Sequence, residues 1–405
     1  MSGRGYSGNG NHKTVTLGDI FEIARGGSPR PIDKFITDDP SAMNWVLIGD
    51  AKSKYITSTK KRITKEGTKK SREVRPGDFL LTNSMSFGRP YIMQTTGCIH
   101  DGWLVLSPRG EDTHPDYFYH LLSSDHLYAE FERRASGATV KNLNIEMVKS
   151  VQVPFPSLNE QRRVASVLDK ADELRAKRRA TLAELDTLTQ SIFLEMFGDP
   201  TANANRFPVH ALESLLRQPL QNGAYYPKDA YTEDAGVEMV HMSDAFYEVV
   251  PRGNLKRVNC AKTDVQKYAL TELDILVARR SLTLEGAAKP CLIPKSDEPL
   301  IFESSFIRVT PHPGKITALY LYHYLANERI KRKRIQPYIT QSTISGINQS
   351  NLARVLVTCP PVILQQDFAC RAAAIESLKA KHQTALAELD ALFASLQHRA
   401  FCGNL

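Results

Sequence analysis

The sequence predicts a mixed α/β fold built from two copies of one unit, each a globular α/β domain followed by a long helix. Three observations support this prediction. Two long stretches carry apolar residues every three or four positions, short strand-like runs separated by Gly/Pro turns fill the residues between them, and this order occurs twice. A chain of 405 residues that is 42% hydrophobic can form two or more globular domains.

The first long helix is expected over residues 157–199. Its start is indicated by Pro156 and by the pair Ser157 and Glu160, which has the spacing of a reciprocal cap. Its end is indicated by Gly198 and Pro200. At 1.5 Å per residue, such a helix would be on the order of 60 Å long, so it needs a long partner to cover its apolar stripe.

The partner lies in the same chain, because the segment TLAELDTL at 181–188 returns as ALAELDAL at 385–392. The offset from Leu182 to Leu386 is 386 − 182 = 204, and it holds without a gap from Thr139/Thr343 to Phe197/Phe401. We interpret this match as an internal duplication with too long a period for a solenoid. A second long helix is therefore expected over 361–405, antiparallel to the first.

The two apolar stripes align at this offset and predict the residues that pack the helix pair or receive a partner: Leu168, Leu182, Leu185, Leu386 and Leu389. Each stripe is interrupted once near its middle, by Arg178 and by His382, and 178 + 204 = 382. In an antiparallel pair these two residues would meet near a pseudo-twofold axis and fix the register. The other interpretation is that both side chains reach solvent at the edge of the stripe.

The residues before each helix are predicted to form two α/β domains, over 14–156 and 200–360, with residues 1–13 as a disordered tail. In the first domain we expect strands at 44–48, 78–82, 91–93, 102–106 and 150–154, and a helix at 116–131. The second repeats this order loosely, with strands at 237–242, 273–279 and 306–310 and a helix at 318–334. The helices stayed alike while the globular parts diverged, which predicts one shared task for the helices and two different tasks for the domains.

The composition favours some classes of function over others. The net charge of +8 favours a polyanion as partner. The six cysteines never form a CxxC pair, and no apolar stretch approaches the ~20 residues of a membrane span. We therefore expect a cytoplasmic protein.

Motifs for chemistry are missing from the sequence. The string closest to an adenine methyltransferase loop, at 358–362, lacks both the amide and the aromatic residue, and no phosphate-binding GxxxxGK[ST] or metal-binding HExxH motif occurs. His100 and Asp101 beside Cys98 are more readily explained as a turn than as a nucleophilic site. We expect a protein that is not itself an enzyme and holds no metal.

The arrangement resembles the specificity (S) subunit of Type I restriction-modification systems. The resemblance rests on the duplicated domains, on PFPSLNEQRRVASVLDKAD and FLEMFGDP at the first helix, and on LGDIFEIARGGSPRP, WVLIGDAKSKYI, RPGDFLLTNSMSFGRP and CIHDGWLVLSP in the first domain. It covers the chain beyond the tail. In the second half, QPLQNGAYYP replaces the RGGSPRP turn, so its identity as a second domain of this kind depends mostly on the repeat.

The resemblance implies two target recognition domains separated by two antiparallel conserved helices. The partners it implies are double-stranded DNA, two methyltransferase (M) subunits docked on the helices, and restriction/translocase (R) subunits, in a bacterial or archaeal cell. It places S-adenosylmethionine on M, and ATP and Mg on R, with no cofactor on this chain. A protein adaptor with duplicated domains, or the specificity component of a related defence methylation system, remains an alternative.

DNA recognition needs phosphate anchors and a few polar side chains at base edges. In the first domain the turn at 25–30 contains two guanidinium groups and no acid, and the loop at 83–89 follows a predicted strand. Lys52 and Lys54 follow another, and hydroxyl groups at 136–139 suit phosphate contacts. The candidates in this domain are Arg25, Ser28, Arg30, Lys52, Asn83, Ser84, Ser86, Arg89 and Thr139.

The second domain offers corresponding positions. Arg279, Arg280 and Ser281 follow the predicted strand 273–279, and Thr343 lies in a loop equivalent to that of Thr139. Tyr225 and Tyr226 would lie against sugar or base, or would form a turn with one buried Tyr. The basic runs 60–62, 69–70 and 329–334 either track phosphates or form solvated faces, and the run at 175–179 would face DNA or an acidic patch on M.

Overall fold

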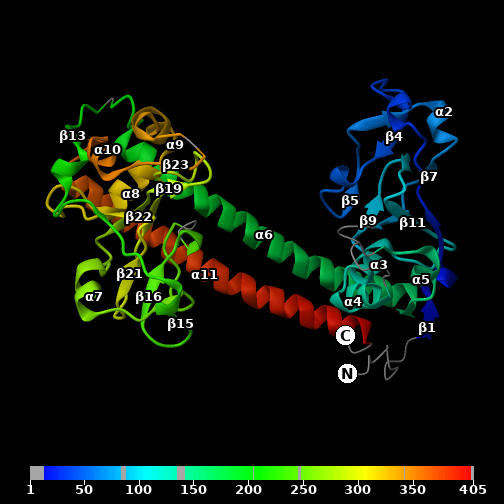
Figure 1. Cartoon of the computed structure of the whole chain (residues 1–405). Helices are drawn as coiled ribbons and strands as arrows, with labels where there is room; N and C mark the ends of the chain where they lie inside the picture. Colours follow the sequence, from blue (N-terminus) through cyan, green and yellow to red (C-terminus); the bar gives the residue numbers. More distant parts are fainter. Residues whose placement is uncertain are drawn as a thin grey trace. The chain divides into compact units, whose positions relative to one another are not determined.

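The computed structural model describes residues 13–83, 88–134, 142–203, 205–244, 248–341 and 343–402, and Figure 1 traces the whole chain. These residues form two units. Unit 1 contains residues 1–180 and 383–405, and unit 2 contains residues 181–382. The boundary falls inside both long helices, so each unit holds half of each helix. Of the predicted tail, residues 1–12 lie outside the described residues, and Lys13 already belongs to strand β1 (Lys13–Thr16).

The two long helices form where the sequence predicts them. Helix α6 (Leu158–Phe197) and helix α11 (Val362–Phe401) each have 40 residues and appear as unbroken ribbons in Figure 1. At the start of α6, the Ser157 hydroxyl accepts a hydrogen bond from the Glu160 amide at 3.4 Å. At its end, Gly198 has a φ of +73°, a left-handed conformation that a glycine adopts without strain and that ends a helix.

Unit 1 contains two five-stranded sheets. One has the order β3 (Ile36–Thr37), β6 (Lys61–Ile63), β4 (Met43–Val46), β10 (Gly97–Ile99), β7 (Arg72–Val74). The other has the order β2 (Phe21–Arg25), β11 (Trp103–Pro108), β8 (Phe79–Thr82), β9 (Pro90–Met93), β5 (Tyr55–Ile56). Strand β1 pairs with β12 (Gln152–Phe155), and helices α3 (Pro115–Leu122), α4 (Asp125–Arg134) and α5 (Ile145–Lys149) complete the domain.

Unit 2 repeats this plan with shorter sheets. One sheet has the order β15 (Tyr231–Thr232), β17 (Arg257–Val258), β16 (Val237–Val240), β21 (Leu300–Phe302). The other has the order β14 (Gln221–Asn222), β22 (Phe306–Val309), β18 (Ile275–Ala278), β20 (Pro290–Leu292). Two further pairs are β13 (Val209–Ala211) with β24 (Leu356–Thr358), and β19 (Arg280–Ser281) with β23 (Ser345–Gly346). In both units the strand pair next to the sheet centre is parallel, β4 with β10 and β16 with β21, so the predicted duplication extends to topology.

Two predicted helices are interrupted. The segment predicted at 116–131 forms α3 and α4, because Ser124 accepts the amide of Leu127 through its hydroxyl and so starts a new helix. The segment predicted at 318–334 forms α8 (Ala318–Ala326), α9 (Glu328–Ile330) and a π-helical turn over Lys331–Ile335. There the Asn327 side chain accepts the amides of Arg329 and Ile330. In both segments the apolar spacing predicts one continuous helix, but a polar side chain that bonds backbone amides interrupts it.

The long helices take part in the core of both units. In unit 1, Val164 and Leu168 of α6 and Phe401 of α11 are buried in the main apolar cluster. In unit 2, Phe193 and Phe197 of α6 meet Phe368 of α11 in edge-to-face contacts with ring centroids 5.6 Å apart. Each half of each helix is therefore part of one domain's core, which explains why the unit boundary cuts through both helices.

A buried glutamine ties each helix start to its domain. Gln161 is fully buried, accepts the His114 amide at 2.8 Å and donates to the carbonyl oxygens of Asp112 and Pro156. Its counterpart Gln365, 204 residues later, is also fully buried and makes the same set of contacts, to Thr317, Lys315 and Pro360. The repeat thus preserves a specific hydrogen-bond cluster as well as an apolar pattern.

The repeat also preserves an ion pair between the helices. In unit 1 the Arg175 Nε atom lies 2.5 Å from Asp390 Oδ1, and its guanidinium lies 4.2 Å from the centre of the Phe393 ring. In unit 2 the Lys379 Nζ atom lies 2.9 Å from Asp186 Oδ1. Since 175 + 204 = 379 and 390 − 204 = 186, the two pairs occupy matching positions. Together with the contacts of Phe193 and Phe368, they show that the helix halves run antiparallel within each unit.

Candidate nucleic-acid interface

Predicted DNA-binding residues of unit 1 gather around one acid. The Arg25 side chain donates to the Asp101 backbone carbonyl at 3.0 Å, and Asn83 donates to the same carbonyl at 3.3 Å. The Ser28 hydroxyl donates to the Asp101 carboxylate at 2.7 Å, and Arg30 lies 3.6 Å from it. The sequence-based expectation of a turn without a competing acid was therefore wrong, because folding brings Asp101 from the β10–β11 turn onto the 25–30 turn. The Ser28 hydrogen bond lowers the pKa of Asp101.

Asn83 is a buried member of this cluster, held by two backbone hydrogen bonds. It is 1% exposed, its amide donates to the Gly102 carbonyl, and its carbonyl accepts the Leu143 amide. Its side-chain Oδ1 atom is buried without a hydrogen-bond partner among the described residues. The next candidates, Ser84 and Ser86, and Thr139 of the other loop, lie outside the described residues, while Arg89 is exposed.

The close approach of two turns holds this cluster together. A Cβ atom on Gly26 would lie 2.0 Å from the His100 carbonyl oxygen, so only glycine fits there. In unit 2 the same restriction falls on Gly223, whose Cβ would lie 2.2 Å from the Phe302 oxygen. The same strand-end geometry therefore recurs in both units with different side chains around it.

Two lysines of unit 1 have different surroundings. Lys52 is exposed, as a phosphate contact requires. Lys54 forms ion pairs with Asp116 at 2.6 Å and with Asp169 of α6 at 2.8 Å. Lys54 belongs to a polar cluster between domain and helix that also includes His120, so its ammonium group is paired within the protein, and a DNA contact by Lys54 stays a prediction. Burial lowers the pKa of His120 despite the Asp169 carboxylate at 2.8 Å.

In unit 2, two predicted loops come together. Strand β19 pairs Arg280 with Gly346 and Ser281 with Ser345, which places the Arg279–Arg280 segment beside the loop that contains Thr343. They border an open cavity of about 320 Å³ lined by Arg279, Arg280, Thr340, Ile344, Ser345, Gly346, Ile347 and Asn348. Arg280 and Thr343 are exposed. The Ser281 hydroxyl accepts the Thr283 amide, so it also shapes the turn.

Arg279 occupies the position in unit 2 that Asn83 occupies in unit 1. Its amide donates to the Ser305 carbonyl and its carbonyl accepts the Ile347 amide, the same two backbone bonds that hold Asn83. Both residues follow the equivalent strands β8 and β18. The same backbone position thus presents an amide in one unit and a guanidinium in the other.

The two tyrosines separate into one exposed and one internal residue. Tyr225 is 82% exposed and remains available to a ligand. Tyr226 packs against the cluster of Ala224, Met239 and Val258, and its hydroxyl donates to Asp264 at 2.8 Å. Tyr226 is partly buried, which favours the alternative of a turn with one buried Tyr, and a DNA contact through Tyr226 stays a prediction.

Most cations of the 329–334 run serve the fold. Arg329 pairs with Asp199 at 2.7 Å, Lys331 donates to the Glu285 carbonyl, and Arg334 donates to Thr358 at 3.1 Å. Arg332 and Lys333 remain exposed. In the helix run at 175–179, Arg175 and Arg179 both contact Asp390. The 329–334 run therefore divides, in the structure, into three cations that contact other parts of the chain and two exposed cations, Arg332 and Lys333.

The helices keep exposed leucines at matching positions. Leu174 and Leu378 are each 43% exposed, and Leu188 and Leu392 are 41% and 50% exposed. Each pair differs by 204 positions. Among the predicted docking residues, Leu168 is fully buried, Leu185 is 7% exposed, and Leu182, Leu386 and Leu389 are half-buried. The expected meeting of Arg178 with His382 stays a prediction.

No group of residues in the described part of the chain has metal-binding geometry, and no helix in that part is long and apolar enough to cross a membrane. Burial raises the pKa of the Cys98 thiol to about 11, which argues against a nucleophilic role beside His100.

Comparison with known proteins gives a consistent assignment. A family model of the Type I restriction modification DNA specificity domain matches residues 9–185. The chain is 23% identical over 315 residues to the Type I restriction enzyme StySPI specificity subunit of Salmonella potsdam, which covers 72% of this chain and 65% of that protein. It is 22% identical over 312 residues to the EcoKI specificity subunit of Escherichia coli K12, covering 71% and 65%.

The fold is similar to solved structures over nearly the whole chain. A chain from a study of complex assembly and conformational transition of the type I R-M system matches with a TM-score of 0.63 at 18% identity, covering 97% of this chain and 98% of that one. The Type I S subunit from M. genitalium matches with a TM-score of 0.52 at 15% identity, covering 98% and 97%.

Proposed function

Because a family model of the Type I DNA specificity domain and curated Type I specificity subunits match this chain, we propose that it is such a subunit and binds a bipartite double-stranded DNA target, one half-site per globular domain. It directs partner subunits to that target and performs no chemistry itself. Methylation of adenine with S-adenosylmethionine belongs to an M subunit, and ATP- and Mg-dependent translocation and cleavage belong to an R subunit. The complex works in the cytoplasm of a bacterial or archaeal cell.

The equivalence of Asn83 and Arg279 is the observation that carries this proposal. Two domains with one topology hold this position with the same pair of backbone hydrogen bonds, yet they present different side chains there. An amide suits adenine and a guanidinium suits guanine in the major groove, so the two domains are suited to different sequences. Asn83 is buried in this structure, so base reading by Asn83 requires its side chain to become accessible.

The cations around these positions supply the anchoring part of binding. Arg30, Lys52 and Arg280 are exposed; Arg30 lies on the 25–30 turn beside Asp101, and Arg280 directly follows Arg279. Phosphate contacts of this kind orient the protein on the duplex without selecting its sequence. The exposed leucines repeated on α6 and α11 are proposed docking positions for two M subunits, because the duplication offers each copy an equivalent apolar surface.

The helices would then set the distance between the half-sites. Shortening both by one turn should bring the domains together by roughly 5 Å. This corresponds to one or two base pairs at ~3.4 Å per step.

Methylome sequencing tests the proposal. Cells that carry the unchanged chain with its neighbouring methyltransferase should show adenine marks on a split motif. Arg89→Ala and Arg279→Ala should each alter the sequence of only one half of that motif. Arg354→Ala is a matched control, because Arg354 is exposed at the end of α10 (Gln349–Ala353) and its side chain forms no hydrogen bond or ion pair in the described part of the chain. A contiguous motif or no motif would instead favour a protein adaptor. The same change in the control would contradict a specific role for Arg89 and Arg279.

A further inference from the structure

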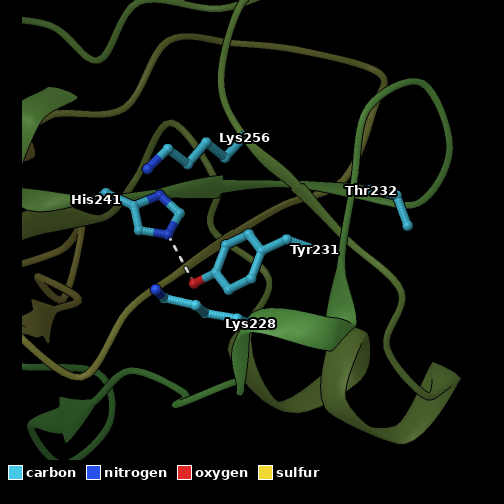
Figure 2. Close-up of a pocket in the computed structure, with 5 residues that line it drawn as sticks. All are labelled: Lys228, Tyr231, Thr232, His241 and Lys256. Atoms are coloured by element: carbon cyan, nitrogen blue, oxygen red, sulfur yellow. Dashed lines mark hydrogen bonds between the residues drawn. The ribbon is translucent and has the colours of Figure 1, made fainter.

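Unit 2 has a basic pocket where unit 1 has an apolar cluster. The pocket encloses about 360 Å³, lies against the β15–β17–β16–β21 sheet, and is lined by Lys228, Tyr231, Thr232, His241 and Lys256. Figure 2 shows the two lysine side chains on either side of the Tyr231–His241 pair, with their ammonium ends toward the hydrogen bond that joins the two rings. This volume falls within the range of small-molecule sites.

Strand register identifies the matching positions of unit 1. Tyr231 and Ile36 pair with the equivalent residues Val258 and Ile63. His241 matches Leu47, since both amides bond an aspartate three residues later. Lys228 begins the short turn before β15 as Ile32 begins the turn before β3.

Unit 1 fills this place with hydrocarbon. Ile32, Ile36 and Leu47 pack against Trp45, Ile63 and Cys98 in one apolar cluster. Three apolar positions of one domain are thus lysine, tyrosine and histidine in the other. A sheet of this topology does not need polar residues there for stability, so the replacement in unit 2 points to a ligand.

The hydrogen bonds of the pocket determine which groups remain for that ligand. His241 Nδ1 lies 2.9 Å from the Met239 carbonyl, which can only accept, so Nδ1 carries the proton. Nε2 then accepts from the Tyr231 hydroxyl at 2.9 Å. The phenol donor is already used within the protein, and the ammonium groups of Lys228 and Lys256 are the donors left among the lining side chains.

Neither ammonium group of the pocket is held in an ion pair. Neither Lys228 nor Lys256 forms a side-chain hydrogen bond or ion pair with any residue that the structure describes, and no carboxylate lines the pocket. Two acids lie near the Tyr231–His241 pair. Asp244 lies 3.8 Å from Nδ1 and accepts the His241 amide. Glu303 accepts the Met242 amide, and burial and then the Glu303 charge raise the pKa of Tyr231. Two unpaired like charges beside one cavity are stabilised by an anion that both can contact.

We propose that this pocket holds a backbone phosphate of the DNA and anchors unit 2 on its half-site. A lysine suits this task, since its ammonium is a compact point charge that binds phosphate without requiring planar geometry. Tyr225 immediately precedes this segment and is 82% exposed, so an aromatic surface is available to the adjoining sugar. This inference rests on the proposed DNA-binding function, and it assigns the pocket an orienting role distinct from base recognition at Arg279.

Salt-dependent DNA binding by the full chain in complex with its methyltransferase tests the proposal. One phosphate contact contributes about 0.9 to the slope of log K against log salt, so losing this contact in Lys228→Ala/Lys256→Ala should make the slope less negative by about 0.9. Between 50 and 200 mM salt, the wild-type complex should lose about 3.5-fold more affinity than the variant. Target and scrambled duplexes should weaken by the same factor, because a phosphate contact carries no sequence information.

The matched control is Lys295→Ala, which removes one exposed charge from the same unit outside the pocket. Paired with Lys262→Ala, another exposed lysine, it removes the same total charge as the test variant. A control with the same loss of slope would overturn the proposal by showing that only net charge matters. Equal slopes for the test variant and the wild type would overturn it as well.

Two further measurements show whether the phosphate comes from DNA or from solution, and whether the proposed function survives if this inference fails. Titration with inorganic phosphate should leave the melting temperature unchanged at concentrations where a target duplex raises it. Lysine-dependent stabilisation by inorganic phosphate, with an unchanged DNA salt slope, would identify a small-anion site and overturn DNA anchoring. If Arg279→Ala alters sequence preference while the lysine variant binds normally, the inference fails and the proposed function stands; if no duplex is preferred, both fail.

Discussion

Replacing Gln365 with alanine should destabilise unit 2 far more than the same change at its neighbour Gln366. Gln365 is fully buried, whereas Gln366 is exposed at the start of the same helix. These adjacent glutamines form a matched pair, because the residue type, the substitution and the helix are the same and only the burial differs.

The magnitude follows from the contacts. Gln365 accepts the Thr317 amide at 2.8 Å and donates to the carbonyl oxygens of Pro360 at 2.8 Å and Lys315 at 3.2 Å. Losing three hydrogen bonds at about 1 kcal/mol each costs about 3 kcal/mol, and the cost rises if the Thr317 amide finds no other partner. For a unit of this size the melting temperature should fall by about 6–12 °C.

Urea unfolding followed by far-ultraviolet circular dichroism, together with calorimetry, measures the effect. Gln366→Ala should stay within about 0.5 kcal/mol of the wild type. Gln161→Ala should lower the stability of unit 1 by an amount similar to that of Gln365→Ala in unit 2, because Gln161 makes the same set of bonds. If Gln365→Ala and Gln366→Ala unfold at the same urea concentration, the reasoning from buried hydrogen bonds is refuted.

Three other perturbations have defined outcomes. Shortening both long helices by one turn should reduce the spacer of the methylated motif by one or two base pairs, as read by methylome sequencing, and an unchanged spacer would refute the role of the helices as a ruler. Arg175→Ala removes the contacts with Asp390 and the Phe393 ring and should lower the free energy of unfolding in urea by about 1–2 kcal/mol. Lys177→Ala, on the exposed face of the same helix, should lower it by less than about 0.5 kcal/mol. Equal losses would contradict a specific inter-helix contact. The hydrogen bonds from Thr201, and then from Arg329, lower the pKa of Asp199 to about 2. The stability that the Asp199 carboxylate contributes should therefore be complete above about pH 4 and lost as the pH falls toward 2. Asp199→Asn should flatten this part of the stability curve, and an unchanged pH dependence in that variant would disprove the role of Asp199.

The sequence predicted several features because they are local or repeat at a constant spacing. The two 40-residue helices follow from the period of their leucines and from terminal signals such as Ser157 and Gly198. The duplication follows from the offset of 204, and the correspondence of Arg279 with Asn83 follows from their places after equivalent strands. Side-chain competition for backbone groups at Ser124 and Asn327 was the main local effect that apolar spacing did not reveal.

Candidate site residues were harder to judge, because a side chain's task depends on what the fold brings near it. Lys52 and Lys54 look alike in sequence, but only Lys54 meets Asp116 and Asp169, which come from helices far along the chain. Asp101 reaches the 25–30 turn from a distant strand end in the same way. Charge runs and polar loops therefore predicted where cations occur, without distinguishing paired cations from free ones.

The sequence by itself determined the repeat, the long helices and the strand ends that present the candidate readers, because these depend on periodicity and backbone preference over neighbouring residues. Only the tertiary structure decided which polar groups face one another across segments distant in sequence. The pocket of Lys228, Tyr231, His241 and Lys256 depends on the register of three strands and one turn, and in unit 1 the same register assembles an apolar cluster. Contacts between distant segments are set by packing and strand pairing, and for that reason these two sites became visible only in the folded chain.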